Sequence, residues 1–571
     1  MGFADLLDRI GGMGRFQITQ VILLCIPIFL MASQNLLQNF SAAIPEHKCR
    51  INETDNFNTS WSERKGWQRV FSPKDAEGNL DKCVEYVDVH WIMVASNVTW
   101  HNTTDLKTQP CVNGWEYNRD EFSSTIITEW DLVCGRKNRR QLAQSIYMAG
   151  VLAGAIILGG LSDRYGRRAL LIWSYLQLAV SGTCTAFSPN YLSYCVFRFL
   201  SGMALSGISL NTTALIVEWI PTKVRTITGT MAGYCYTVGQ LILAGLAYGI
   251  RDWRWLQLTV SLPFIIFFMY SWWFPESGRW LVLSGKPEKA VKEIKKVAKL
   301  NGKTDEGEKI TLETLKSDMI KEMACATSSY SIIDLVRTTT LRRISCGVSF
   351  IWFSTSFAYY GLAMDLQKFG VSIYLIQVIF GAVDIPAKLI STTSMIYIGR
   401  RVTQGVSLIL GGLAVLANIF VPTELQVLRT SLAVFGKGCF AASFSCAFLF
   451  TTELYPTVIR QSGLGLGSTM ARLGGIVAPL VKMLGDFYPF LPLLIYGGVP
   501  VLSGLVAYFL PETVNKPLPD TIEEVEMGKK TPAKEKEIVP LQSLKTKPGV
   551  MEKKDILPLQ PLKIDPAPQE V

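Results

Sequence analysis

The stretch Asp163-Arg164-Tyr165-Gly166-Arg167-Arg168 decides the fold, because it ends in Gly-Arg-Arg, the first of three short motifs that occur twice in the chain. Gly166-Arg167-Arg168 returns as Gly399-Arg400-Arg401, an offset of 233 residues (399 − 166). Two further motifs recur at nearly the same offset: Glu218-x-x-Pro221-Thr222-x-x-Arg225 with Glu453-x-x-Pro456-Thr457-x-x-Arg460, and Pro275-Glu276-Ser277 with Pro511-Glu512-Thr513. Such weak self-similarity predicts a chain built from two related halves.

Each repeated motif follows an apolar stretch long enough to cross a bilayer as a helix, which needs about 20 residues. We place about twelve such spans near 16–38, 141–161, 169–187, 191–217, 227–249, 255–274, 342–363, 373–397, 403–421, 429–451, 464–484 and 491–510. The first span is too long and too poor in a cleavage site to be a removable signal peptide. The pattern predicts an all-α membrane protein with twelve transmembrane helices in two six-helix bundles.

The composition agrees with this class and excludes others. Of 571 residues, 49% are hydrophobic and 18% charged, and the formal net charge is +10. The basic residues fall in short segments between apolar runs, so no domain carries the basic face that nucleic-acid binding requires. The chain has no phosphate-cradling Gly-Lys-Ser/Thr loop, and its Cys and His residues show no metal-ligand spacing. We therefore expect no enzyme, no ATP-driven pump and no metal site.

Two long polar segments interrupt the spans and differ chemically. Residues 39–138 contain four sugar-acceptor triplets and four cysteines, which predicts an extracellular glycosylated loop with two disulfides. The three possible disulfide connectivities stay open. Residues 275–341 are rich in Lys and Glu and predict cytoplasmic helices. The acceptor asparagines are Asn52, Asn58, Asn97 and Asn102, and the cysteines are Cys49, Cys83, Cys111 and Cys134.

The short loops support this orientation, because most of their arginines and lysines fall on the side of the second polar segment. Both termini are therefore predicted to be cytoplasmic. The predicted organisation is 1–38, N-terminus and first helix; 39–138, extracellular loop; 139–274, helices 2–6; 275–341, cytoplasmic linker; 342–510, helices 7–12; and 511–571, a disordered cytoplasmic tail.

The charged residues of the repeated motifs are candidates for gating, because arginines at helix ends that meet acidic partners can brace one conformation and release in another. The alternative is that the arginines only follow the positive-inside rule. The gating candidates are Asp163, Arg164, Arg167, Arg168, Glu218, Arg225, Arg400, Arg401, Glu453 and Arg460.

The stretch from Asp163 to Arg168 resembles the signature between the second and third helices of the major facilitator superfamily. Pro275-Glu276-Ser277-Gly278-Arg279-Trp280-Leu281 is similar to the motif after the sixth helix of its sugar-porter and organic-ion branches. The glycosylated first loop and the motif from Glu453 to Arg460 narrow the resemblance to solute carrier family 22. Ser356-Phe357-Ala358-Tyr359-Tyr360-Gly361-Leu362 and the stretch 380–389 look like its organic anion transporters.

This resemblance implies a major facilitator fold in the plasma membrane, basolateral in epithelium. It also implies exchange of extracellular organic anions, such as p-aminohippurate-like compounds, drugs and urate-like compounds, for an intracellular dicarboxylate such as 2-oxoglutarate. We expect the bilayer and these small anions as partners, no nucleic acid, and no cofactor; a role for chloride and the oligomeric state stay open.

Two ionisable side chains deep inside spans are the main candidates for substrate binding, because a charge there costs about 2.5–3.5 kcal/mol on insertion scales. Arg472 has no carboxylate within one turn of its own helix and could hold a carboxylate by two hydrogen bonds. Lys388 follows Asp384 by one turn, so its neighbour could neutralise it. The organic cation relatives carry an aspartate at the position corresponding to Arg472. The resemblance therefore implies that the charge at this position separates the anion transporters from the cation transporters.

Aromatic residues at helical spacing could supply the surface for flat organic anions. Helix packing is the alternative for each, and the resemblance places several of them in the central cavity of the anion transporters. The aromatic candidates are Trp352, Tyr359, Tyr360, Tyr236, Phe444 and Phe448. Asn35 and Ser468 could add hydrogen bonds.

Two rival functions remain at this stage. One is an organic cation or zwitterion carrier on the same scaffold, and the other is a membrane scaffold or sensor that transports nothing.

Overall fold

The computed structural model describes residues 3–50, 72–74, 78–87, 107–315, 317, 334–364, 366–369, 371–422, 424–456, 458–514, 516, 519 and 522–527. One compact unit covers Met1–Glu526, and a second covers Met527–Val571. The four predicted glycosylation sites and most of the predicted tail lie outside the described residues, but Ile522–Met527 of the tail form the short helix α24, where disorder was predicted.

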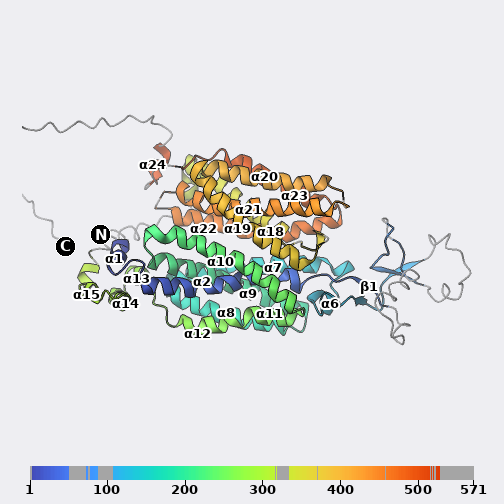
Figure 1. Cartoon of the computed structure of the whole chain (residues 1–571), viewed down its shortest axis with the longest axis horizontal. Coiled ribbons are helices and arrows are strands. Elements are labelled where there is room, and N and C mark those ends of the chain that lie inside the picture. The colour runs from blue at the N-terminus through green and yellow to red at the C-terminus, as the bar shows by residue number, and fades with distance from the viewer. Residues whose placement is uncertain are drawn as a thin grey trace, which may run out of the picture. The chain divides into compact units, whose positions relative to one another are not determined.

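The described chain is almost entirely helical (Figure 1), and each predicted span overlaps one of its long helices or a pair of shorter ones. The first half consists of α2 (Arg15–Leu36) with α3 (Gln38–Ser41), α7 (Asn138–Tyr165), α8 (Arg167–Ala186), α9 (Tyr191–Trp219), α10 (Thr222–Gly249), α11 (Trp253–Ser261) and α12 (Pro263–Ser271). The second half consists of α18 (Thr339–Ala363), α19 (Ile373–Tyr397), α20 (Arg400–Phe420), α21 (Gln426–Leu454), α22 (Arg460–Met483) and α23 (Leu491–Ala507). The predicted fold class is confirmed.

Eight of the described helical stretches are long and apolar enough to cross a membrane by length and composition alone. The other spans miss this criterion for local reasons. Helices α10 and α18 are long but less apolar, α23 is short, and the sixth span is divided between α11 and α12. The division falls where Pro263 begins α12, because proline has no backbone N–H to continue the ladder of the preceding helix.

The helices present their two ends to different surroundings (Figure 1). At one end lie α1 (Phe3–Arg9), α13 (Gly278–Leu283), α14 (Pro287–Leu300) and α15 (Thr304–Glu308), and we call it the linker end. At the other lie α6 (Ile126–Trp130) and four short strands, and we call it the disulfide end. The strands form two antiparallel pairs, β1 (His47–Cys49) with β4 (Trp115–Tyr117) and β2 (Val84–Tyr86) with β3 (Thr108–Pro110).

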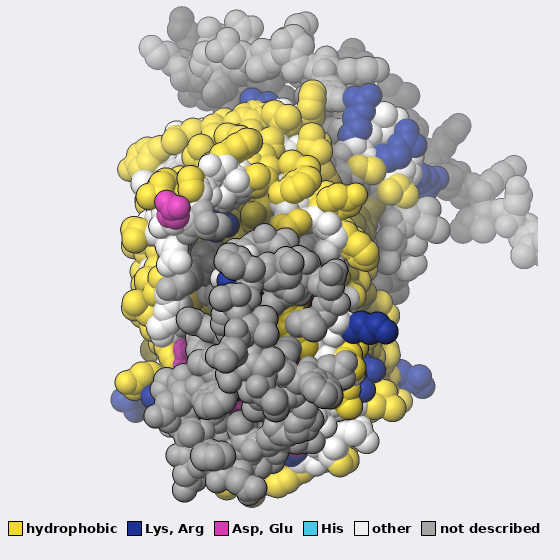
Figure 2. All heavy atoms as spheres, turned by 90° about the vertical axis from the view of Figure 1, so that its right-hand side faces the viewer, with side chains coloured by type: hydrophobic (Ala, Val, Ile, Leu, Met, Phe, Trp, Pro, Cys, Tyr) yellow, Lys and Arg dark blue, Asp and Glu magenta, His cyan; other side chains and the backbone are white. Residues whose placement is uncertain are grey.

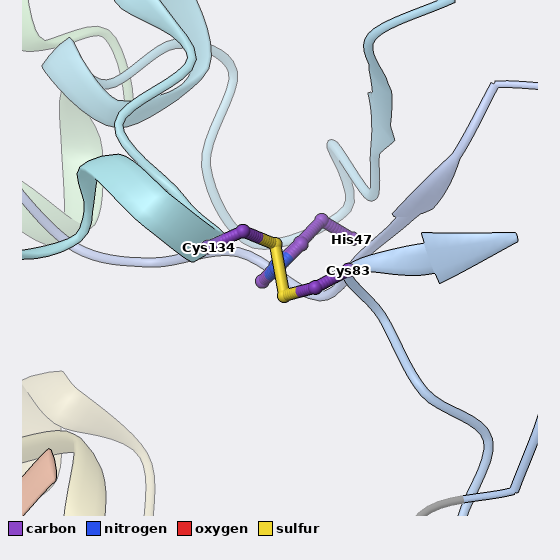
Figure 3. Close-up of side chains that lie close together, drawn as sticks. All are labelled: His47, Cys83 and Cys134. Carbon is purple, nitrogen blue, oxygen red and sulfur yellow. A yellow bond between two sulfur atoms is a disulfide. The ribbon is translucent and has the colours of Figure 1, made fainter. Parts of the chain in front are cut away.

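Two disulfides tie the strands of the disulfide end together. Cys49 bonds to Cys111, and Cys83 bonds to Cys134. The structure thus selects one of the three connectivities that the sequence left open. His47 lies beside the second bond (Figure 3), but the bonded sulfurs offer no thiolate to a metal ion, so this group is not a metal site.

The flanks of the helices expose large apolar side chains in numbers that a water-facing surface would not tolerate. Trp173, Ile156, Leu192 and Phe509 are more than half exposed. Seen onto the disulfide end, hydrophobic side chains cover most of the visible flanks, while charged side chains are few (Figure 2). This is the surface expected of helices that face lipid.

The sequence repeat reappears as a repeat of contacts. Gly166 and Gly399 both have positive φ, at 107° and 110°, which lets each end one helix and start the next. Arg167 Nη1 donates to the carbonyl oxygen of Ser162 at 2.9 Å, and Arg400 Nη1 donates to that of Met395 at 3.1 Å. Both acceptors precede their arginine by five residues, so the two turns have the same construction.

The acidic residues of the motifs brace these arginines within each half. Arg167 lies 2.9 Å from Asp163 and 3.6 Å from Glu218, whereas Arg400 lies 3.0 Å from Glu453. The expected partnership of arginines and acids is therefore present at both helix ends. Its proposed release in another conformation stays a prediction.

The remaining gating candidates contact backbone carbonyl groups or an aromatic ring. Arg225 and Arg460 donate from Nε to the carbonyl oxygens of Ile220 and Tyr455, again five residues earlier. The guanidinium of Arg164 lies 5.5 Å from the centre of the Tyr165 ring. Arg168 donates from its side chain to the carbonyl oxygen of Trp272.

A glutamate from the third repeated motif caps the N-terminus of one helix in each half. Glu276 accepts the backbone N–H groups of Arg167 and Arg168 at the start of α8. Glu512 accepts those of Arg400 and Arg401 at the start of α20, at 2.9 and 3.0 Å. A carboxylate at a helix N-terminus satisfies orphan donors and complements the helix dipole.

The two capping glutamates differ in their electrostatics. Burial raises the pKa of the Glu276 carboxyl, although backbone N–H donors partly offset this. Burial acts in the same direction on Glu512, but donation from Arg400, Thr513, Val514 and Arg401 outweighs it and lowers the pKa of Glu512. The charged form of Glu512 is thus the better stabilised of the two.

We expect Glu512→Gln to reduce the free energy of unfolding of the purified protein by about 1 kcal/mol and so to lower its melting temperature. Glu276→Gln should lower the melting temperature less. A carboxyl with a depressed pKa stabilises the fold above its unfolded pKa and loses that contribution as pH falls through the folded value. The difference between wild type and Glu512→Gln should therefore shrink between pH 7 and pH 4. A difference that grows toward pH 4 would contradict this assignment.

Candidate functional site

The candidate site lies where helices of the first half meet helices of the second, along two seams. Helix α10 packs against α19, and α7 packs against α22. In Figure 1, α10 runs along the boundary below α19 and α22. Most of the charged and aromatic candidates lie on α10, α18, α19, α21 and α22.

Arg472 lies midway along α22 and points toward the first half. Its Nη1 donates to Ser468 Oγ at 2.6 Å, one turn earlier on the same helix, and its Nη2 donates to Ser206 Oγ of α9 at 3.4 Å. Among the described residues it makes no ion pair with a carboxylate. The predicted pairing with Ser468 is present, and the guanidinium retains donors for a further acceptor.

Lys388 lies on the other seam and also reaches into the first half. Its Nζ donates to the carbonyl oxygen of Gly233 and to Thr237 Oγ1 of α10, both at 2.8 Å. The Tyr234 ring centre lies 5.8 Å from the same nitrogen. These partners are neutral, so the lysine is hydrogen-bonded across the seam to uncharged groups.

Asp384, the expected neutraliser of Lys388, is bonded to a different lysine. Lys437 Nζ of α21 lies 2.7 Å from Asp384 Oδ1 and also donates to the carbonyl oxygen of Phe380 at 2.6 Å. Asp384 is 1% exposed and Lys437 is 0% exposed. The i, i+4 spacing made Asp384 a possible neutraliser of Lys388, and the structure shows that the close ion pair of this carboxylate is with Lys437 of α21.

We call Asp384, Lys388, Lys437 and Arg472 the central cluster, a name for the charged side chains at the two seams: Arg472 lies at the seam of α7 with α22, and the other three lie around the seam of α10 with α19. Together they hold three cations and one carboxylate, a formal charge of +2. Gln240 of α10 donates to Asp384 Oδ2 at 3.2 Å and joins the buried pair to the first half.

The aromatic candidates form a connected group beside the central cluster. The Tyr359 ring lies 5.5 Å from both the Tyr360 and the Phe444 rings, and Trp352 lies 6.3 Å from Phe444. Tyr359 and Trp352 are buried, and their polar atoms are bonded to Asp384 at 3.4 Å and Thr451 at 2.9 Å. Both side chains therefore help to hold the helices of the second half together.

Phe448 lies one turn beyond Phe444 on α21 and is 54% exposed. It shares a helix face with Phe444, because residues four apart lie one above the other. Its ring is therefore available to an incoming molecule, while the ring of Phe444 is partly covered by Tyr359 and Trp352.

Asn35 joins two tyrosines of the first half. Its Nδ2 donates to Tyr236 OH at 3.1 Å, and its Oδ1 accepts from Tyr147 OH at 3.0 Å. Tyr236 and Tyr147 belong to α10 and α7, the two helices that form the seams. Asn35 thus fixes the positions of both seam helices relative to α2.

Further bonds join the halves toward the disulfide end. Asn39 donates to the carbonyl oxygen of Ala363 at 2.8 Å, and Ser145 donates to that of Ile476 at 3.0 Å. Lys137 lies 2.8 Å from Asp486. The two halves are therefore fastened to each other from the central cluster to the disulfide end.

Sequence reasoning missed two buried cations, Lys437 and Arg198. Each lies inside a predicted span, so the rule that found Lys388 and Arg472 would have found them as well.

Comparison with known proteins gives close relatives over nearly the whole chain. A family model described as "Sugar (and other) transporter" matches residues 97–525. A Xenopus laevis protein, solute carrier family 22 member 6-A, is 74% identical over 552 residues, covering 97% of this chain and 99% of that protein. A Danio rerio protein, solute carrier family 22 member 6, is 57% identical over 92% of this chain and 94% of its own length. An Oryctolagus cuniculus protein, organic anion transporter 3, is 52% identical over 92% of this chain and 94% of its own length.

Solved structures share the fold at much lower identity. The xylose transporter XylE from E. coli, in a partially occluded inward open conformation, matches with a TM-score of 0.56 at 15% identity, covering 88% of this chain and 99% of that chain. The same protein bound to 6-bromo-6-deoxy-D-glucose matches with a TM-score of 0.56 at 17% identity, covering 89% of this chain and 99% of that chain.

Proposed function

We propose a transport cycle and a substrate class for this chain, which belongs to solute carrier family 22 and is a multi-pass membrane transporter rather than an enzyme. It carries organic anions by alternating access, with the central cluster as the substrate site. Extracellular anions of the p-aminohippurate, drug or urate type enter in exchange for an intracellular dicarboxylate such as 2-oxoglutarate. No cofactor is required in this cycle, and a chloride requirement is a separate question.

The observation that supports this most strongly is the formal charge of +2 in the central cluster. A cation in a low-dielectric site attracts a carboxylate far more strongly than it would in water. Lys437 already has Asp384 within 2.7 Å, which leaves Arg472 and Lys388 for the cargo. Arg472 can hold a carboxylate with two parallel hydrogen bonds, and Lys388 can add a point charge.

The exchange follows from the same excess charge. Arg472 and Lys388 each reach across a seam, to Ser206 and to Gly233 and Thr237. A bound anion neutralises part of the cluster and competes for these donors, so the halves can rock about the site. When the site is empty, its cations stay unneutralised and the carrier changes conformation slowly. An anion bound from the opposite side of the membrane therefore accelerates the return, which gives exchange.

The aromatic residues beside the central cluster explain how the site can accept many different organic anions. Phe448 is exposed, and Tyr360 and Phe444 are partly exposed beside the cluster. Flat rings on a substrate can stack on these faces without a specific hydrogen-bond pattern, which favours many anions of moderate affinity over one of high affinity.

Uptake into proteoliposomes tests this function. We expect the initial uptake of labelled p-aminohippurate to rise several-fold when the vesicles contain 2-oxoglutarate, compared with matched vesicles that contain mannitol. A labelled quaternary ammonium compound should show no uptake above protein-free vesicles. Uptake of the cation alone would favour the rival cation carrier, and no flux of either compound would favour a non-transporting scaffold.

We also propose that the disulfide end is extracellular, that both termini are cytoplasmic, and that the protein lies in the basolateral membrane of epithelial cells. Disulfides form in oxidising compartments, which supports this orientation. In cells, replacing Asn52, Asn58, Asn97 and Asn102 with Gln should abolish the mobility shift that peptide N-glycosidase F produces on the wild type. An unglycosylated wild-type chain at the cell surface would contradict an extracellular position for residues 39–138.

A further inference from the structure

The chain enters and leaves the disulfide end beside the second half, at the connection between α18 and α19. On the side of the second half, the contacts come from the short helix η3 (Leu366–Phe369) and from the first turn of α19. On the side of the first half, they come from Ile44, which follows α3, and from Phe122, which precedes α6. The transport cycle described above gives these residues no role.

Gln367 of η3 holds the backbone of Ile44 with both groups of its side-chain amide. The Ile44 N–H donates to Gln367 Oε1, and Gln367 Nε2 donates to the Ile44 carbonyl oxygen, both at 3.1 Å. A primary amide carries a donor and an acceptor side by side, so it can satisfy both polar groups of one backbone residue. An aliphatic side chain of similar size would lose both bonds at once.

Tyr374, in the first turn of α19, packs among three aromatic rings of the first half. Its ring centre lies 5.6 Å from that of Phe40 in a stacked arrangement, 6.1 Å from that of Phe122 and 5.6 Å from that of Tyr248. Its hydroxyl donates to the carbonyl oxygen of Glu121 at 3.4 Å. Phe40 and Phe122 are buried, so withdrawing Tyr374 would uncover apolar rings of the first half.

Arg251, in the turn between α10 and α11, fastens the segment around Phe122 to the first half. Its Nη1 donates to the carbonyl oxygen of Asp120 at 3.0 Å, and its own carbonyl oxygen accepts the Ser123 N–H at 3.1 Å. Its guanidinium carbon also lies 5.8 Å from the centre of the Tyr248 ring. The aromatic rings around Tyr374 are therefore held together by bonds within the first half.

These contacts lie between the disulfide end and the central cluster. Tyr374 precedes Asp384 by ten residues (384 − 374), about 15 Å along α19. Gln377 lies one turn further in, is buried, and accepts from Asn39 Nδ2 at 3.5 Å. Because α19 packs on α10 along this seam, the halves have to separate at Tyr374 before a solute can pass between them from the disulfide end.

We propose that Ile44, Phe122, Gln367 and Tyr374 form the outer gate of the transport pathway, and we call them the loop clamp. This inference rests on the proposed function, because a gate presupposes alternating access. The disulfide end moves with the first half, and it releases the connection between α18 and α19 when the site opens toward the extracellular side. The base of the extracellular segment thus determines how often the central cluster is open to that side.

The loop clamp acts on the balance between conformations, because its residues stabilise the closed arrangement and do not belong to the central cluster. A change that weakens only one conformation shifts the population toward the other. Tyr374→Ala removes three ring contacts and a hydrogen bond, so it should raise the ratio of open to closed molecules at least about tenfold. Gln367→Leu removes two hydrogen bonds and should raise this ratio several-fold.

A reporter cysteine just inside the loop clamp measures the open fraction without relying on transport. In intact cells that express the full chain, Gln377→Cys should react slowly with a membrane-impermeant methanethiosulfonate added outside. Combining it with Tyr374→Ala should speed the reaction at least about tenfold, and combining it with Gln367→Leu should speed it several-fold. Labelling is counted per chain at the cell surface, and the same variants without the reporter give the contribution of the native cysteines.

Two variants provide matched controls for this reaction. Tyr374→Phe keeps the three ring contacts and loses only the hydrogen bond to Glu121, so it should label at nearly the original rate. Phe487→Ala removes a ring that is 78% exposed, next to Asp486 at the same end of the molecule, and it should leave the rate unchanged.

A cross-link across the loop clamp should have the opposite effect. A short bifunctional methanethiosulfonate that joins Ile44→Cys to Gln367→Cys should stop p-aminohippurate uptake, while each single variant treated in the same way should retain it. Faster labelling in Tyr374→Ala and Gln367→Leu without any p-aminohippurate uptake would support the gate and contradict the proposed substrate. Labelling at the original rate in both variants would overturn the gate, even if uptake were normal.

Discussion

Arg472→Asp is expected to reduce p-aminohippurate uptake to the level of vesicles without protein. Hydrogen bonds to a charged group contribute about 1.5–3 kcal/mol each, and 1.4 kcal/mol corresponds to about a tenfold change in affinity. Losing a two-pronged contact therefore costs roughly 100-fold or more, and the new negative charge adds repulsion. The measurement is the initial uptake rate, normalised to the protein reconstituted in each preparation.

Two matched variants separate the possible causes of such a loss. Arg472→Lys keeps the charge but not the planar fork, so it should retain uptake at a reduced affinity. Ser468→Ala removes the hydrogen bond that orients Arg472 and should have a smaller effect than either change at Arg472. Equal uptake by wild type and Arg472→Asp would show that the guanidinium does not meet the substrate, and the proposed site would then be wrong.

Asp384→Asn is expected to destabilise the protein more than any other single change in the central cluster. It leaves the Lys437 ammonium buried at 0% exposure without its counter-charge, and breaking a buried pair in this way costs about 3–5 kcal/mol. The variant should unfold at a clearly lower temperature and give a smaller yield of monodisperse protein.

The double variant Asp384→Asn with Lys437→Met is the decisive comparison. It removes both charges, so much of the lost stability should return, and the departure from additivity measures the coupling of the pair. Lys388→Met should change the melting temperature less, because Lys388 donates to a carbonyl and a hydroxyl. If Lys388→Met were as destabilising as Asp384→Asn, the assignment of Lys437 as the partner of Asp384 would be wrong.

The sequence predicts the fold well because its signals are local. Apolar length defines the spans, and the repeated Gly-Arg-Arg and Glu-x-x-Pro-Thr motifs define the halves. The structure repeats these motifs contact by contact, down to the arginine that donates to a carbonyl five residues earlier. The break between α11 and α12 was also readable, since Pro263 stands within the predicted sixth span.

The partners within the central cluster were less predictable, because they depend on which helices meet. The spacing left open whether Asp384 pairs with Lys388 on the same helix, and the structure shows its close ion pair with a lysine of α21. The disulfide connectivity has the same character, since it depends on how the loop folds: Cys49 ends β1 and bonds to Cys111, which follows β3, a strand of the other antiparallel pair. Lys437 and Arg198, by contrast, stand in predicted spans and could have been found from the sequence alone.

The cations of the central cluster all stand on α19, α21 and α22, while the first half meets them with amide, hydroxyl and carbonyl groups. Such a division separates two properties that natural selection can alter independently. Mutations on α7, α9 and α10 can reshape the cargo that fits while its sign stays fixed by the other bundle. Under the proposed function, the choice among organic anions and the preference for negative charge therefore reside in different halves of the molecule.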